Sequence, residues 1–316
     1  YTDGSVQLNH GGTEMGQGLF QKIAQIVAAS FAIDVAAVRL QATDTSKVPN
    51  TSATAASSGT DLNGAAAEDA CRQIKTRLAE FGARVHGGAA GAVVFRDGRV
   101  TGDRWSFTFA ELVAQAYRAR VQLSAAGFYA TPKIHYDRAT ASGRPFFYFA
   151  YGAALCEAEI DVATGESRML RADLLHDVGR SINPAIDLGQ IEGGFMQGLG
   201  WLTCEELVFD RDGRLRTHAP STYKIPTARD LPADFRVRIL ESAGNREPTI
   251  HRSKAVGEPP LMLALSVREA LRDAIAAFGA PGGCVALPSP LTHEVIWHAV
   301  QARLARVLAK LASAAE

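Results

Sequence analysis

A carboxylate placed before two prolines is the residue best suited to chemistry in this sequence. Glu258 lies in the segment Ser253–Leu261 and is followed directly by Pro259 and Pro260. A residue before proline disfavours helical geometry, whereas proline is well tolerated in a first helical turn. We therefore predict a non-helical Glu258 at the entrance of a helix. Such a glutamate can serve as a general base or as an ordinary first-turn acid. The helix N-terminus favours its ionised form, and burial would favour its neutral form.

A glycine-rich run near the N-terminus could hold an oxyanion. The run His10–Leu19 has glycines at positions 11, 12, 16 and 18 and leads into an amphipathic helical pattern. A junction of this kind offers unpaired backbone N–H groups and the positive end of a helix dipole. The run matches neither G-x-G-x-x-G nor G-x-x-x-x-G-K-[ST], so a nucleotide site lacks its diagnostic residues. Gln17 adds an amide that can donate and accept. A purely structural turn is the alternative.

Two other segments of small residues allow both a structural and a ligand-binding interpretation. Residues 49–61 are rich in Ser, Thr and Ala. They form either a flexible loop in which Thr60 or Asp61 caps the next helix, or the mouth of a pocket whose hydroxyls donate to a phosphate. In residues 187–200, small residues recur on one helical face. Because glycine costs about 1 kcal/mol per interior helical position relative to alanine, this helix must approach another element or a buried ligand closely.

The elements that position these residues follow a mixed pattern of strands and helices. Hairpin turns are predicted at Asp97-Gly98, Thr164-Gly165 and Asp212-Gly213. Apolar periodicity predicts helices over residues 20–31, 62–81, 109–123 and 261–278. We therefore predict an α+β fold with mixed and antiparallel sheets and packed helices, in two subdomains. The predicted division is 1–125, which carries both loops of small residues, 126–280, which carries Glu258, and a C-terminal tail, 281–316.

Composition excludes several classes of protein. The 33 Lys and Arg residues balance the 33 Asp and Glu residues, so there is no basic excess to bind nucleic acid or an anionic membrane. No apolar run reaches the 18 residues of a membrane span. Four scattered cysteines (Cys71, Cys156, Cys204 and Cys284) form no C-x-x-C pair, which predicts reduced thiols, a cytoplasmic location and no cysteine-ligated metal. The chain opens at Tyr1 directly in a strand pattern, so we expect it to begin inside a longer polypeptide.

Taken jointly, these segments resemble the large, molybdenum-cofactor-binding subunit of the xanthine oxidase family of molybdenum hydroxylases. The resemblance covers nearly the whole chain except its last stretch, from about residue 280. The run Gly127–Pro132 looks like the xanthine dehydrogenase form of a segment that differs in aldehyde oxidases, which favours a purine substrate. The resemblance rests on six ordered motifs: Gly11–Gly18, Thr54–Gly64, Asp177–Pro184, Gly189–Gly193, Pro220–Pro226 and Lys254–Pro260.

The resemblance implies that this chain binds the molybdenum cofactor, with the metal held by molybdopterin and by no protein side chain. Glu258 matches the family's catalytic glutamate. The implied reaction is oxidative hydroxylation of hypoxanthine and xanthine to urate, with water as the oxygen source and Glu258 as the general base at the molybdenum centre. Gln190 is implied as a further pterin contact. The implied lining of the pterin phosphate and molybdenum site consists of Gly16, Gln17, Gly18, Ala56, Ser57 and Thr60.

The resemblance also implies partners, because the chain matches only the C-terminal part of such a subunit. The N-terminal remainder of the same subunit would supply a second glutamate and an arginine that orient the purine. Iron–sulfur clusters of the 2Fe-2S type and FAD are expected in a partner subunit or domain, with NAD as the final acceptor, in a dimer of heterodimers. An aldehyde oxidase-type molybdenum hydroxylase and a non-catalytic pterin-binding homologue are the alternatives. A carboxylate-pair hydrolase lacks a partner acid for Glu258.

Overall fold

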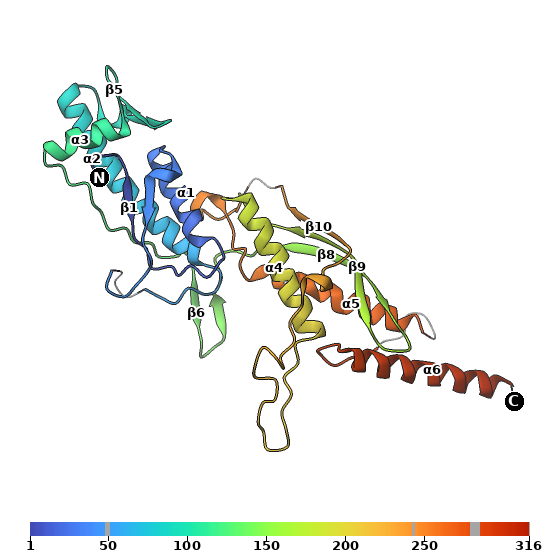
Figure 1. Ribbon diagram of the computed structural model, residues 1–316. Helices are drawn as coiled ribbons and strands as arrows, with labels where there is room; N and C mark the ends of the chain where they lie inside the picture. Colours follow the sequence, from blue (N-terminus) through green and yellow to red (C-terminus); the bar gives the residue numbers. More distant parts are fainter. Residues whose placement is uncertain (48–50, 242–243, 279–284, 316) are drawn as a thin grey trace. The chain divides into compact units, whose positions relative to one another are not determined.

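The computed structural model of the protein describes residues 1–47, 51–241, 244–278 and 285–315 (Figure 1). The chain divides into two compact units, each assembled from three separate stretches of sequence. The sequence-based division at residues 125 and 280 stays a prediction. The first unit comprises Tyr1–Phe149, Val178–Ile186 and Ser242–Ala255, and the second comprises Ala150–Asp177, Asp187–Glu241 and Val256–Glu316.

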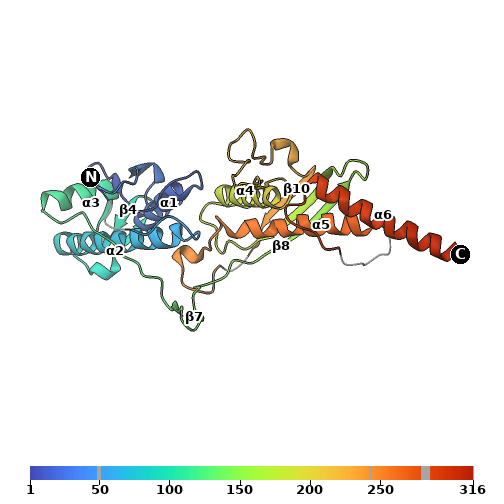
Figure 2. The same ribbon diagram turned by 90° about the horizontal axis from the view of Figure 1, so that it is seen from below.

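Two helices form the centre of the first unit. Helix α1 (Leu19–Phe31) packs against the long helix α2 (Gly59–His86), as Figure 2 shows. The predicted helix over residues 20–31 is confirmed, because its apolar stripe, which includes Ile23 and Phe31, is buried. On either side of α1 in sequence, strands β1 (Val6–Leu8) and β2 (Val38–Leu40) pair in parallel. The glycine-rich run therefore joins β1 to α1.

A small antiparallel sheet and a third helix complete the core of the first unit. Strands β3 (Val94–Arg96), β4 (Arg99–Thr101) and β5 (Ser106–Thr108) are joined in order, which confirms the Asp97-Gly98 hairpin. Helix α3 (Phe109–Arg118) follows at once and is fixed by a capping box between Thr108 and Glu111. It ends earlier than the predicted residue 123, because Arg120 takes a left-handed φ of 61° and the Val121 N–H donates to the Ala116 carbonyl.

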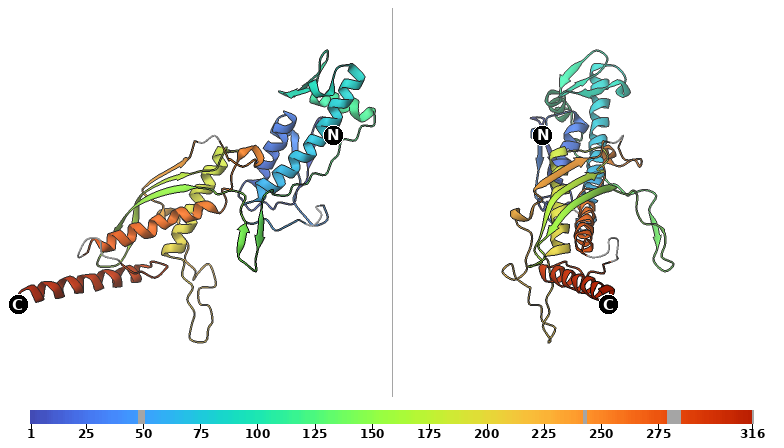
Figure 3. Two further views of the ribbon diagram at one scale, coloured as in Figure 1. Left: turned by 180° about the vertical axis from the view of Figure 1, so that it is seen from behind. Right: turned by 90° about the vertical axis from the view of Figure 1, so that its right-hand side faces the viewer.

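Other segments of the first unit are short. The hairpin β6 (His135–Asp137) and β7 (Ser142–Arg144) stands out as a separate antiparallel ribbon in Figure 3. Gly127 lies against α2, where a Cβ atom would fall 1.9 Å from the Ala66 carbonyl oxygen. Short 3-10 helices cover η1 (Val35–Ala37), η2 (Ala90–Ala92) and η4 (Ile250–Arg252).

The second unit is built on a mixed three-stranded sheet. Strand β9 (Ser167–His176) pairs antiparallel with β8 (Gly152–Ile160) and parallel with β10 (Asp234–Ile239). The Thr164-Gly165 hairpin is thereby confirmed, whereas the Asp212-Gly213 turn closes only a single antiparallel bridge between Phe209 and Leu215. The predicted α+β class with mixed sheets is confirmed. The remaining elements are α4 (Pro184–Thr203), η3 (Ala228–Asp230), η5 (Pro259–Ala264), α5 (Leu265–Ala276) and α6 (His293–Ala315).

The glycine face of α4 packs against the turn that carries Glu258. A Cβ atom at Gly194 would lie 2.9 Å from the Cβ of Pro260, and one at Gly198 would lie 2.6 Å from both the Cβ of Ala264 and the carbonyl oxygen of Leu261. Gly193 has no atom within 4 Å of an added Cβ. Close approach between α4 and η5 therefore accounts for Gly194 and Gly198.

The periodicity predicted over residues 261–278 divides at Leu265, where the 3-10 helix η5 becomes the regular α5. Helix α5 packs along β8, and Phe195 of α4 meets Phe235 of β10 with ring centroids 5.5 Å apart. These contacts bury both helices against the sheet of the second unit.

The predicted reduced thiols match three free cysteines among the described residues. Cys71 is buried, and burial raises its pKa to about 11, so it stays protonated. Cys156 and Cys204 are half-buried. Cys284 lies outside the described residues. Within the described part of the chain, no helix combines the length and the apolar character needed to cross a bilayer.

Replacing Gly198 by alanine should lower the stability of the second unit by about 1–3 kcal/mol, because the added methyl group overpacks the contact between α4 and η5. Gly193→Ala is the matched control, with a change between zero and about 1 kcal/mol of stabilisation. Thermal unfolding of the full-length protein checks both variants. Equal midpoints for the two variants would contradict the close approach.

Candidate cofactor-binding and catalytic site

The glycine-rich loop of the first unit is organised around the carboxylate of Glu14. Its Oε1 accepts hydrogen bonds from the N–H groups of Gly16 at 2.9 Å and Gly18 at 3.0 Å, and its Oε2 accepts from Phe20 at 2.9 Å. Burial acts to raise the pKa of Glu14, but these donors outweigh it and hold the pKa below its usual value. The expectation that the loop presents unpaired N–H groups at Gly16 and Gly18 is therefore wrong, because the chain's own carboxylate pairs with them.

Gln17 keeps hydrogen-bonding capacity within the same loop. Its Oε1 accepts from the Met15 N–H at 2.6 Å, and its Nε2 donates to the Thr13 carbonyl at 2.9 Å. A carboxamide has two donor hydrogens and two acceptor lone pairs, so one of each is left beyond these contacts. The left-handed φ of 103° at Gly16 and 75° at Gly18 explains why glycine flanks Gln17 on both sides.

The structure brings the second loop of small residues against the first. The Thr13 N–H donates to Oγ1 of Thr54 at 2.8 Å, and a Cβ atom at Gly11 would fall within 3 Å of the Thr51 side chain. Both loops belong to the first unit. Pro49 and Asn50 lie outside the described residues. The predicted contacts Gly16, Gln17 and Gly18 therefore lie in a loop that is hydrogen-bonded to the one that carries Ala56 and Ser57 and leads into α2.

The turn before α2 has an unusual backbone. Ala56 and Ser57 are consecutive non-glycine residues with φ of 55° and 52°. Each left-handed residue costs about 1–2 kcal/mol, so the surrounding structure must fix this turn. Helix α2 then starts at Gly59, with Ser58 as the N-cap and no capping side chain. The prediction that Thr60 or Asp61 caps the helix is wrong, because both lie inside its first turn.

His10 is a polar residue of this loop that sequence reasoning missed. It is buried, and its Nδ1 accepts from the Gly12 N–H at 3.1 Å, which leaves the proton on Nε2. Burial lowers the pKa of His10, so the ring is held neutral. Within the described part of the chain, the buried Nε2 has no hydrogen-bond partner. Its position directly before Gly11, at the start of the glycine-rich run, could have identified it from the sequence.

A half-buried carboxyl, that of Asp61, links α2 to the segment that leads to Glu258. The hydroxyl of Tyr148 donates to Oδ2 of Asp61 at 2.6 Å and accepts from the Ala255 N–H at 2.8 Å. Burial raises the pKa of Asp61 to about 6, and the Tyr148 hydrogen bond opposes that shift. Burial and the neighbouring Asp61 raise the pKa of Tyr148, so the phenol stays protonated. No sequence pattern indicated this pair.

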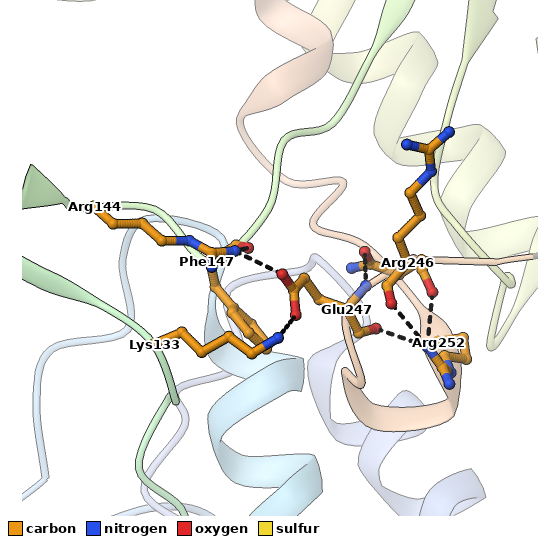
Figure 4. A network of polar contacts seen from close by, with 7 residues as sticks. Lys133, Arg144, Phe147, Arg246, Glu247 and Arg252 are labelled. Atoms are coloured by element: carbon orange, nitrogen blue, oxygen red, sulfur yellow. Dashed lines mark hydrogen bonds and ion pairs between the residues drawn. The ribbon is translucent and has the colours of Figure 1, made fainter.

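The loop that precedes Ala255 is held by a second polar network (Figure 4). Glu247 accepts from Nζ of Lys133 at 2.7 Å and from Arg144 at 2.6 Å, and these two cations lower its pKa. The Arg252 guanidinium donates to the carbonyls of Asn245 at 3.2 Å and Arg246 at 3.0 Å. Both contacts close the loop before it reaches Ala255.

Glu258 lies exposed at the start of η5 in the second unit. Its φ of −94° and ψ of −37° are helical, so the predicted non-helical geometry is wrong. The Leu261 N–H donates to the Glu258 carbonyl at 3.1 Å, and this 3-10 turn outweighs the pre-proline preference. The predicted position at a helix entrance is confirmed. Gln190, on α4, is half-buried in the same unit.

The model of the molybdopterin cofactor-binding domain matches residues 1–232 of the chain. The chain therefore belongs to the cofactor-binding domains of the xanthine oxidase family of molybdenum hydroxylases. It is 46% identical to the xanthine dehydrogenase of Oryza sativa subsp. japonica over 94% of its length, and 46% identical to the xanthine dehydrogenase/oxidase of Mus musculus over 95%. It spans 21% of each of these relatives.

A solved structure shares the fold. Quinoline 2-oxidoreductase from Pseudomonas putida 86 superimposes with a TM-score of 0.80 at 26% identity, over 95% of this chain and 37% of that one. The resemblance found in the motifs is thus confirmed at the level of the family. The individual contacts assigned to Gly16, Gln17, Gly18, Ala56, Ser57, Thr60, Gln190 and Glu258 stay predictions.

Asp61→Asn should change stability in a pH-dependent way. Because the pKa of Asp61 is raised to about 6 in the fold, the protein binds this proton more tightly folded than unfolded, and loses stability as pH rises from about 4 through 6. The neutral asparagine avoids that loss, so its advantage over the parent should grow by on the order of 1–3 kcal/mol between pH 4 and pH 7.

Unfolding midpoints at pH 4, 5, 6 and 7 measure this advantage. Asp137→Asn is a control of opposite sign, since hydrogen bonds from Ala139 and Thr140 lower the pKa of Asp137. Its disadvantage should grow as pH rises through the acidic range. A pH-independent difference between parent and Asp61→Asn would contradict the raised pKa.

Proposed function

We propose that the chain is part of the molybdenum-cofactor-binding subunit of a xanthine dehydrogenase, which hydroxylates hypoxanthine and xanthine to urate with water as the oxygen source. The observation that carries this proposal is the 46% identity to xanthine dehydrogenases over nearly all of the chain. Because the chain spans about a fifth of these relatives, substrate, acceptor and partners belong to the whole protein and are proposed with it.

The residues of the first unit suit a phosphate-bearing pterin. Gln17 retains one donor and one acceptor, and the buried Nε2 of His10 is a donor without a partner among the described residues. The hydroxyl-bearing Ser57 lies in the strained turn next to this loop, and Thr60 lies in the first turn of α2. In the proposed site these groups orient the cofactor, with Gln190 of the second unit as a further contact.

Glu258 is the proposed general base. When bound, the molybdenum cofactor supplies the two-electron oxidation of the substrate carbon. Glu258 accepts at its carboxylate the proton released from water as the new carbon–oxygen bond forms. Glu258 lies exposed at the start of η5, and the packing of Gly194 and Gly198 on η5 limits the movement of its backbone.

The proposal includes the rest of the electron path. The N-terminal remainder of the subunit supplies the further purine-orienting residues, and a partner subunit or domain holds the 2Fe-2S clusters and FAD that pass electrons to NAD. The assembly is proposed as a dimer of heterodimers. An aldehyde substrate is the second candidate, since an aldehyde oxidoreductase from Desulfovibrio desulfuricans shares the fold with a TM-score of 0.73.

Glu258→Gln in the full-length protein should lower kcat by about 10²–10⁴-fold, because the amide cannot accept a proton. Molybdenum and pterin content should stay at the parent level. Glu206→Gln, at an exposed glutamate of the same unit, is the matched control and should leave kcat unchanged. Steady-state turnover of hypoxanthine and metal analysis measure the effect. Near-parent turnover of Glu258→Gln would refute the role of Glu258.

The substrate class is tested by comparing kcat/KM for hypoxanthine and for an aromatic aldehyde on one preparation. We expect kcat/KM to be at least about 10²-fold higher for hypoxanthine, because a site whose polar groups hydrogen-bond to a purine ring discriminates against a substrate that lacks those groups. Preference for the aldehyde would favour the aldehyde oxidase-type alternative. A folded, assembled protein without molybdenum or pterin would favour the non-catalytic homologue.

A further inference from the structure

The backbone that leads to Glu258 is held from two sides. The Lys254 N–H donates to the Val178 carbonyl at 2.8 Å, and the next N–H, that of Ala255, donates to the Tyr148 hydroxyl at 2.8 Å. The first of these neighbouring N–H groups is therefore held by backbone and the second by a single side chain. Glu258 follows Ala255 after only Val256 and Gly257.

The hydrogen bonds of Tyr148 have one possible direction. Its oxygen accepts from Ala255, so its only proton goes to Asp61, at 2.6 Å. Asp61 thus acts as the acceptor that orients the hydroxyl. A phenylalanine at position 148 would leave both the Ala255 N–H and the Asp61 carboxyl without this partner.

The same pair reaches the proposed cofactor contacts. Asp61 is the neighbour of Thr60 in the first turn of α2 and follows the strained turn at Ala56 and Ser57. The path Thr60–Asp61–Tyr148–Ala255 lies within the first unit and connects the loop of the pterin contacts to the segment of the base. A displacement of about 1 Å at a reacting group can cost about 10²-fold in rate, so this connection matters for turnover.

We propose that Asp61 and Tyr148 are positioning residues for the hydroxylation reaction: through the Ala255 N–H they fix the backbone from which Glu258 departs, relative to the loop that contacts the cofactor. This inference rests on the proposed function. The pair does not touch the substrate, and it acts on the alignment of the general base.

The test uses the full-length, cofactor-loaded protein with its partners. Tyr148→Phe should lower kcat by about 10–100-fold with KM within about twofold and with parent molybdenum content. Asp61→Ala should have the same effect, whereas Asp61→Asn, which keeps an acceptor for the hydroxyl, should retain kcat within about threefold. The double variant Tyr148→Phe with Asp61→Ala should be no slower than either single one. Tyr136→Phe, at an exposed tyrosine of β6, is the matched control.

Parent-like kcat in Tyr148→Phe, or an equal loss in Asp61→Asn and Asp61→Ala, would overturn the proposal. If Tyr148→Phe fails to fold, the comparison of the two Asp61 variants decides. Amide hydrogen exchange at Ala255 tests the contact without turnover: Tyr148→Phe should speed it, and an unchanged rate overturns the pair. A parent-like Glu258→Gln would instead refute the proposed function, while the exchange result would still decide on the pair.

Discussion

The structure depends on how the segment Ser253–Ala255 is held. This short run is the last part of the first unit before the second unit begins at Val256, and the N–H groups of Lys254 and Ala255 both donate within the first unit. Gly179 forms an antiparallel bridge with Ser253, where a Cβ atom on the glycine would meet the Arg252 carbonyl oxygen at 2.4 Å. The bridge therefore requires a glycine at position 179. Glu258 stands three residues beyond the end of this segment.

The two units fix their backbone in different ways: the first uses polar networks and the second uses close packing. In the first unit, charged and hydroxyl side chains fix irregular backbone: Glu247 with its two cations, Tyr148 with Asp61, and Glu14 in the glycine loop. In the second unit, small residues on α4 let η5 approach closely. Hydrogen bonds fix the orientation of the loop groups that make them, whereas packed helices resist displacement along their whole contact. Glu258 stands between the two kinds of support, so its backbone is constrained on both sides along the chain.

Much of the fold could be predicted from the sequence, because helix periodicity and hairpin turns depend on residues that are close together in the chain. The apolar period of residues 20–31 and the Asp-Gly and Thr-Gly turns at 97 and 164 concern neighbours within a few residues. Helix ends were less predictable: α3 ends early through a left-handed Arg120, and α2 begins before Leu62. The pre-proline preference failed at Glu258, since one hydrogen bond to Leu261 outweighs it. Asp61 and Tyr148, 87 residues apart, have no local signal, and neither do the left-handed Ala56 and Ser57.

The hydrogen bonds of Glu14 hold the glycine loop in a fixed conformation, which bears on how the loop could bind a ligand. Loops that wrap an anion are often disordered until it arrives, and then the loss of conformational entropy weakens binding. Here the carboxylate of Glu14, a residue of the loop itself, accepts from the N–H groups of Gly16, Gly18 and Phe20. These hydrogen bonds hold the loop in one conformation, so a ligand that bound to it would order less backbone than one that bound to an unstructured segment.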